Sequence, residues 1–122
     1  MTTRQGAMPS AWPGTESEWL LYVALHRAGK EAGRDFQYKG MVPEGGISFQ
    51  FASPPDLGIN VTGMMQDYAA GIERSGINQI TKQQALGSGI QLIFIDDVDL
   101  QQDPAYYVEE ALKYRDHSHM GG

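Results

Sequence analysis

Three acidic residues in the chain have the chemistry to hold a divalent metal ion. Glu18 lies near the start of an apolar helical segment, Asp56 follows two prolines, and Asp67 follows an aliphatic run that ends at a glycine. Carboxylate oxygens are the ligands that Mg²⁺ prefers, and bound Mg²⁺ activates water and stabilises a leaving oxygen. Each position also has a structural interpretation, respectively as part of a capping box, as a turn residue and as a helix cap.

Two further groups have residue types that bind cations. Asp96, Asp97 and Asp99 resemble part of a calcium loop, but the glycine and the distal glutamate of such a loop are missing. We interpret them as a solvated turn that leads into a helix. His117 and His119 form a weak metal-binding pair near the C-terminus. Since P-loop, dinucleotide-binding and nucleophile-elbow motifs are also missing, we expect no cofactor.

Alternating helices and strands would position these groups. The sequence T-E-S-E at 15–18 is a capping box that starts a helix, and a glycine after Ala28 favours its end. The predicted elements are helix 15–28, strands 35–38, 47–51 and 57–62, helix 67–86, strand 90–95 and helix 103–115. We therefore predict an α/β fold of order α-β-β-β-α-β-α, in which a mixed sheet is flanked by helices.

Hydrophobic periodicity predicts which side chains face the core. Residues at helical spacing predict an apolar stripe on the first helix, formed by Trp19, Tyr22, Val23 and Leu25. A period of two in the strand 47–51 predicts a buried face formed by Ile47, Phe49 and Phe51. Ser48 and Gln50 then lie on the opposite face.

The chain is long enough for one domain between two tails. We predict a flexible arm over 1–14, a single domain over 15–116 and a flexible tail over 117–122. Met8 and Trp12 lie in the proline-containing arm, where they suit docking on a neighbouring protein, because exposed aromatic residues make good anchors. The alternative is a leader with no binding role.

Charge and hydropathy restrict the function. A net charge of −6 disfavours broad nucleic-acid binding, which depends on lysines and arginines that meet phosphates. A DNA-binding remnant would need its cations on one face, namely Arg27, Lys30, Arg34 and Lys39. The apolar runs are too short to cross a membrane, and the N-terminal residues lack the apolar section of a secretion signal.

The element order and several motifs resemble a known group. The motifs are ISF (47–49), INVTGMMQDY (59–68), GIQLIFID (89–96) and YRDHS (114–118). They look like those of short phage-encoded proteins, which are similar in turn to very-short-patch-repair (Vsr-like) endonucleases of the PD-(D/E)XK, restriction-endonuclease-like class. The resemblance covers residues 15–118. It implies a restriction-endonuclease-like core with the predicted element order.

The resemblance also implies that most of the metal site is missing. Ser48 stands where the Vsr-like pattern has its key aspartate, and Gln66-Asp67 replaces the tryptophan-histidine pair that contains the general base. Thr62 matches the position of the backbone metal ligand, and Glu18 matches the first-helix glutamate. A serine hydroxyl is a poor replacement for a carboxylate that binds a hard cation.

Two functions follow as expectations. The first is a non-catalytic phage structural or assembly protein that contacts other phage structural proteins, with the arm as one contact, in the virion or the host cytoplasm. The alternative is a Mg²⁺-dependent endonuclease with a rearranged site built from Glu18, Asp56 and Asp67, with Thr62 as a further metal candidate. Only the alternative requires a metal, and whether DNA is bound is left open.

Overall fold

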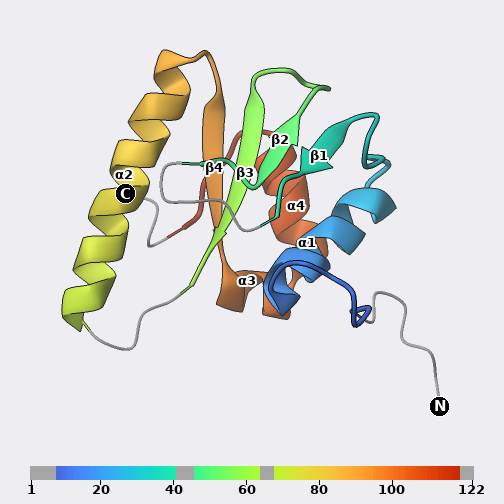
Figure 1. The fold of residues 1–122 in the computed structure, drawn as a ribbon, viewed down its shortest axis with the longest axis horizontal. Coiled ribbons are helices and arrows are strands. Elements are labelled where there is room, and N and C mark those ends of the chain that lie inside the picture. The colour runs from blue at the N-terminus through green and yellow to red at the C-terminus, as the bar shows by residue number, and fades with distance from the viewer. Residues whose placement is uncertain (1–7, 41–45, 64–67, 119–122) are drawn as a thin grey trace.

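The computed structural model describes residues 8–40, 46–63 and 68–118 as an α/β domain (Figure 1). The elements are α1 (Glu16–Arg27), β1 (Phe36–Tyr38), β2 (Phe49–Phe51), β3 (Leu57–Thr62), α2 (Tyr68–Gly87), β4 (Gln91–Asp96), α3 (Asp97–Gln102) and α4 (Pro104–Leu112). The sequence predicted one helix after the last strand, whereas the described residues form two there, α3 and α4. Within these ranges no helix is long and apolar enough to cross a membrane.

The four strands form one mixed sheet in the order β1-β2-β3-β4. β1 pairs antiparallel with β2, and β2 pairs antiparallel with β3, while β3 and β4 run parallel. Parallel neighbours need a crossover connection, and α2 lies within the one between them. The register of β3 and β4 runs from Leu57↔Gln91 to Thr62↔Asp96, so both strands end at the same end of the sheet.

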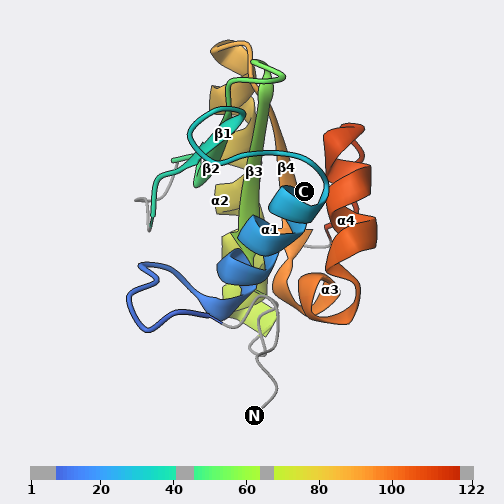
Figure 2. The same ribbon diagram turned by 90° about the vertical axis from the view of Figure 1, so that its right-hand side faces the viewer.

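Helices cover both faces of the sheet (Figures 1 and 2). α2 packs on one face, and α1, α3 and α4 lie on the other, so the predicted mixed sheet with flanking helices is confirmed. The main core lies beneath α1, α3 and α4 and contains fully buried Leu21, Phe49, Ile59 and Leu100. A smaller apolar cluster, which includes Phe94, lies on the α2 side.

The start of β2 differs from the predicted strand. Phe49 and Phe51 are buried in the main core as expected, but Ile47 packs against the smaller cluster on the α2 side. The Ser48 amide donates to Oδ1 of Asn60 (2.7 Å), and regular strand pairing begins at the next residue. The prediction that Ile47 faces the same way as Phe49 is wrong, because the backbone before Phe49 is not a continuous strand.

Local sequence signals determine both ends of α1. The Thr15 hydroxyl accepts from the Glu18 amide (3.1 Å), and the Glu18 carboxylate accepts from the Thr15 amide (3.0 Å), so the predicted capping box is confirmed. At the other end Gly29 has φ +91°, a conformation that favours glycine, and the Lys30 amide donates to the Leu25 carbonyl (2.9 Å).

The buried face of α1 is rotated from the predicted stripe. Leu21, Ala24 and Leu25 are buried against the other helices and the sheet. Three residues of the predicted stripe are only half-buried, namely Trp19, Tyr22 and Val23. The prediction is correct for Leu25, and half-buried Tyr22 also packs against the main core, whereas Trp19 and Val23 are not part of it. The reason is that α1 carries apolar side chains over more than one stripe, and tertiary packing selects among them.

The acidic stretch after β4 begins a helix earlier than predicted. Asp97 and Asp99 lie in the first turn of α3, where negative side chains are favoured by the helix dipole. Asp96 is the N-cap residue of α3 and is fully buried. The next helix, α4, begins as expected with Pro104 in its first turn after the cap residue Asp103.

The chain after α4 folds back over β4, which is an edge strand of the sheet. Asp116 accepts from the Phe94 amide (3.3 Å) and forms an ion pair with Lys82 of α2 (2.6 Å). The Ser118 hydroxyl donates to the Asp96 carboxylate (2.5 Å). Ser118 belongs to the predicted flexible tail, but in the structure it is hydrogen-bonded to Asp96, the last residue of β4.

Candidate functional site

Glu18, the match to the first-helix metal ligand, takes part in several structural contacts. Its Oε1 atom accepts from the Tyr38 hydroxyl (2.9 Å) as well as from the amide and hydroxyl of Thr15 (3.0 and 3.4 Å). Burial, together with the hydrogen bond to Glu18 and its negative charge, raises the pKa of the Tyr38 phenol. The carboxylate thus links the start of α1 to β1.

The two strand positions matched to metal-facing groups hold buried neutral side chains. Ser48 stands beside Asn60, which accepts from the Ser48 amide and donates to the Gly46 carbonyl (2.8 Å). Thr62, at the end of β3, accepts from Nδ2 of Asn78 in α2 (3.2 Å). At both positions the neighbouring polar groups hold segments of the fold together.

Of the other two acids of the predicted rearranged site, Asp56 lies in the described part of the chain, where its hydrogen-bond partner differs from those of Glu18. Asp56 accepts from the Tyr114 hydroxyl (2.5 Å), and this hydrogen bond is the main cause that raises the pKa of Tyr114 to about 12. Asp56 precedes β3 and Thr62 ends it, which places their backbones roughly 20 Å apart on an extended strand. Asp67 lies outside the described residues.

Among the described residues no group of three or more histidine and acidic side chains is arranged to hold a metal ion. Asp96 instead accepts from Ser118, and its two acidic neighbours belong to α3. His117 contacts the Glu110 carboxylate through Nε2 (2.9 Å). Its predicted metal-binding neighbour, His119, lies outside the described residues.

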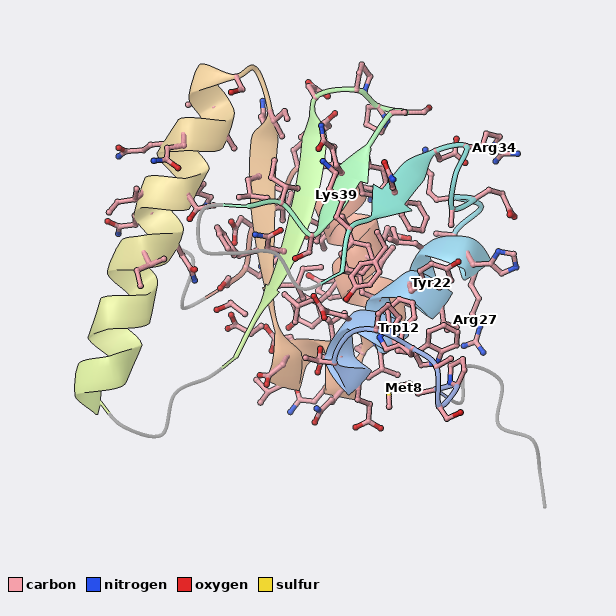
Figure 3. All side chains as sticks on the ribbon, viewed as in Figure 1. Met8, Trp12, Tyr22, Arg27, Arg34 and Lys39 are labelled. Carbon is pink, nitrogen blue, oxygen red and sulfur yellow. The ribbon has the colours of Figure 1, made fainter. Side chains whose placement is uncertain are left out.

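Part of the predicted arm packs on the domain in an aromatic cluster (Figure 3). Trp12 stacks on Tyr38, with centroids 4.6 Å apart and planes 16° apart. It meets Trp19 and Tyr22 edge-on, with centroids 5.0 and 5.2 Å away. The prediction placed Trp12 against a neighbouring protein, and in the structure it contacts its own chain. Met8 is 46% exposed beside this cluster.

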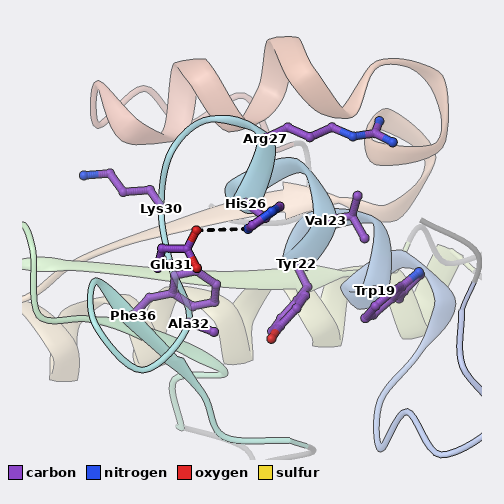
Figure 4. Close-up of a pocket in the computed structure, with 9 residues that line it drawn as sticks. All are labelled: Trp19, Tyr22, Val23, His26, Arg27, Lys30, Glu31, Ala32 and Phe36. Atoms are coloured by element: carbon purple, nitrogen blue, oxygen red, sulfur yellow. Dashed lines mark ion pairs between the residues drawn. The ribbon is translucent and has the colours of Figure 1, made fainter. Parts of the chain in front are cut away.

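A groove extends from the aromatic cluster along the outward side of α1 (Figure 4). Trp19, Tyr22 and Val23 line it from the helix, and Phe36 lines it from β1. Its volume of ≈ 730 Å³ lies in the range of ligand-binding sites. Trp19 and Tyr22 belong both to the groove and to the cluster that holds Trp12.

Basic residues border this groove, but they do not form one continuous patch. The four cations that a DNA-binding face would require are Arg27, Lys30, Arg34 and Lys39. The first two line the groove, and Lys30 also donates to the Ser53 carbonyl (3.3 Å). Arg34 is paired with Asp35 (2.7 Å), and Lys39 contacts Gln50. Figure 3 shows Arg27, Arg34 and Lys39 spread along the side formed by α1 and β1. The arrangement supplies two cations to one groove.

Sequence reasoning missed the groove because the residues that line it were assigned to other roles. Trp19 and Tyr22 were assigned to the core, and Lys30 was considered only as a contact for DNA. One signal was present in the sequence: α1 carries more apolar residues than a single buried stripe can hold. Such an excess indicates that a helix has a second apolar face.

No protein-family model, curated protein or solved structure matches the chain. The geometry of these residues and the resemblance in the sequence motifs are therefore the basis for assigning a function.

Proposed function

We propose that the chain is a non-catalytic phage structural or assembly protein, built on a restriction-endonuclease-like scaffold, that acts through protein–protein contacts in or near the virion. The motif resemblance to short phage-encoded proteins supports the phage origin. The sheet supports the nuclease-like scaffold, because three antiparallel strands are followed by a helix and a parallel fourth strand.

The observation that carries the proposal is that the side chains at two of the matched positions, Glu18 and Thr62, are hydrogen-bonded within the fold. Glu18 joins α1 to β1, and the Thr62 hydroxyl accepts from a residue of α2. A magnesium site requires several oxygen ligands around one point. Asp56 and Thr62 lie at opposite ends of β3, so one ion cannot contact both.

Charge supports the same conclusion. A nuclease has to approach a polyanion, whereas this chain carries a net charge of −6. Four lysines and arginines of the described surface are already paired with acidic side chains, namely Arg34 with Asp35, Lys82 with Asp116, Lys113 with Glu109 and Arg115 with Glu110. These pairs leave little positive charge with which to hold a DNA backbone.

A nicking assay tests the absence of catalysis. Supercoiled plasmid is incubated with the purified chain and Mg²⁺ or Mn²⁺, beside a metal-dependent nuclease as a positive control. Binding of the same ions is measured by calorimetry. We expect no nicking above the buffer control and no saturable heat of binding, because the residues that the structure describes bring no complete set of oxygen ligands together.

The Asp67→Ala and Glu18→Gln variants identify the source of any activity. Nicking by the parent chain that disappears in both variants would overturn the proposal and establish the Mg²⁺-dependent endonuclease. Nicking that persists in both variants identifies a contaminating nuclease, and repurification then decides the question.

The interaction part of the proposal is tested on the arm. Met8 is 46% exposed in the arm and Val98 is 42% exposed on α3, so the two form a matched pair of exposed apolar residues. In the encoding phage, we expect the chain to co-sediment with purified particles. Met8→Asp should reduce the amount of chain that co-sediments, whereas Val98→Asp should not. Complete absence from particles and from their assembly intermediates would contradict the virion location.

A further inference from the structure

The groove along α1 continues an aromatic surface that already binds a peptide segment. Trp12, from the chain's own arm, packs against Trp19 and Tyr22, and both of these residues also line the groove. Trp19 and Tyr22 thus contact an indole ring that comes from a proline-containing segment of the same chain. Aromatic side chains that meet edge-on gain stabilisation beyond the area they bury.

The groove has aromatic surface in its lining and cations at its border. Phe36 and Val23 add apolar surface to it, while Arg27 and Lys30 bring positive charge (Figure 4). Glu31 is the acidic residue in the lining, and its carboxylate lies 3.3 Å from Nδ1 of His26. The fixed charge of the groove is thus net positive on a chain whose total charge is −6.

We infer that this groove binds a linear peptide of a partner protein, in which an aromatic anchor is flanked by acidic residues. The aromatic anchor suits the apolar lining, and carboxylates suit Arg27 and Lys30. The inference rests on the proposed function and adds the chemical class of the partner and the surface that receives it. Electrostatic complementarity of this kind selects the partner more than it raises the affinity.

A short acidic peptide fits this surface better than a nucleic acid does. A nucleic-acid strand presents one phosphate per nucleotide and needs a track of cations. Arg34 pairs with Asp35, Lys39 contacts Gln50, and Lys30 donates to the Ser53 carbonyl (3.3 Å), so the cations on this side of the molecule do not form such a track. Two cations match a peptide with a few carboxylates.

Fluorescence anisotropy with a defined probe tests the inference. The probe is a labelled six-residue peptide with a central tryptophan-proline pair and two acidic residues on each side. One control peptide carries asparagine and glutamine in place of the acids, and a second carries alanine in place of tryptophan. We expect saturable binding of the probe, roughly tenfold weaker binding of each control, and weaker probe binding as salt screens the charges.

Two chain variants locate the binding site. Lys30→Glu reverses a charge in the groove lining, and Lys113→Glu reverses an exposed charge at the C-cap of α4, outside that lining. Lys30→Glu should weaken binding roughly tenfold and Lys113→Glu should leave it unchanged. Circular dichroism and urea unfolding confirm that both variants are folded. As a second groove variant, Val23→Asp should weaken binding as well.

Several outcomes would overturn the inference. They are an undetectable affinity for the probe, equal binding of the neutral peptide, equal effects of the two charge reversals, or tighter binding of a labelled oligothymidine than of the probe. Plasmid nicking tests the proposed function separately. A chain that neither nicks DNA nor binds the probe keeps its proposed function and loses this groove as the binding site, whereas a chain that nicks DNA loses the proposed function itself.

Discussion

At the scale of single residues, Glu18 is the point where the start of α1, β1 and the arm meet. Its Oε1 atom accepts from both Thr15 and Tyr38, and the Tyr38 ring supports Trp12. Resemblance to a nuclease assigned this carboxylate to a metal. The hydrogen bonds assign it to stability, since a buried carboxylate needs partners for its lone pairs.

We predict that Thr15→Ala and Tyr38→Phe destabilise the chain in a coupled way. Each removes a group that contacts Glu18 and should lower the free energy of unfolding by about 1 kcal/mol. Because both groups contact the same carboxylate, the double variant should deviate from additivity by about 0.5 kcal/mol or more.

Urea unfolding of the four chains in this cycle measures the coupling. Tyr106→Phe is the control, because Tyr106 is an exposed tyrosine on α4. It should leave the free energy of unfolding unchanged. Strict additivity of the Thr15 and Tyr38 variants would show that Glu18 does not couple them.

The sequence predicted some features of the candidate site and not others, for physical reasons. The capping role of Glu18 was predictable because Thr15 lies only three residues away. The contacts of Asp56 with Tyr114 and of Thr62 with Asn78 were not, because those partners are distant in sequence and are brought together only by the fold.

At the scale of elements, Gly14 determines how closely the arm approaches the domain. A Cβ atom at this position would lie 1.9 Å from the Tyr38 hydroxyl oxygen and 2.6 Å from Oε1 of Glu18. Gly14→Ala should therefore displace Tyr38 and loosen Trp12, at a cost of about 1–3 kcal/mol in the free energy of unfolding.

Gly87→Ala is the matched control for this prediction. Gly87 ends α2, and a Cβ atom there would meet nothing within 4 Å. Alanine should be neutral or stabilising there, by up to about 1 kcal/mol. Denaturant unfolding followed by tryptophan fluorescence compares the two variants. Equal stability of both would show that the arm does not pack against the domain in solution.

The segment after α4 protects the edge strand β4. Unpaired strand edges are sites where other chains add, and Asp116 covers this one by accepting from the Phe94 amide. Asp116→Ala should lower the free energy of unfolding by about 1–3 kcal/mol, because it removes both this hydrogen bond and the ion pair with Lys82. Amide hydrogen exchange at Phe94 should become faster.

Asp116→Asn separates the two contributions. It keeps an oxygen that can accept from the Phe94 amide and removes the charge that pairs with Lys82. Exchange at Phe94 should then remain close to that of the parent chain while stability falls. Unchanged exchange in Asp116→Ala would contradict the role assigned to this segment.

Elements with strong local periodicity were predictable, and those that depend on tertiary contacts were not. The alternation around Phe49 and the aliphatic run of β4 predicted two strands of the sheet. The position of Ile47 was not predictable, because Asn60, from the neighbouring strand, pulls the backbone out of regular pairing. α3 was missed because its aspartates also suit a turn.

At the scale of the whole molecule, paired carboxylates make the fold sensitive to acid. The hydrogen bond from His117, with the charge of Arg115, lowers the pKa of Glu110. The hydrogen bond from Arg34, with the Glu31 amide, lowers the pKa of Asp35. A depressed pKa in the folded state stabilises the fold above the unfolded pKa, and this contribution is lost as the pH falls through the folded pKa.

We therefore predict that stability falls as the pH drops below about 4.5, the unfolded pKa of a glutamate. Glu110→Gln cannot ionise, so its stability deficit relative to the parent chain should shrink as the pH falls. Glu109→Gln is the control, since this neighbour is exposed and contacts Lys113 at 3.6 Å. Melting temperatures of the parent chain and each variant, measured between neutral pH and about pH 3, give this stability deficit. A deficit for Glu110→Gln that is constant with pH would contradict the role of ionised Glu110 in stability.

The aromatic cluster also gives the molecule an optical property. The chain has two tryptophans, and their indole centroids lie 5.0 Å apart. Electronic transitions of rings this close couple, so the circular dichroism of the pair depends on their relative orientation. All tryptophan fluorescence of the chain therefore comes from this aromatic cluster. Displacement of the arm, or binding of a ligand in the groove beside it, would change both the absorption and the emission of the two tryptophans. Binding at this site can therefore be followed without an added label.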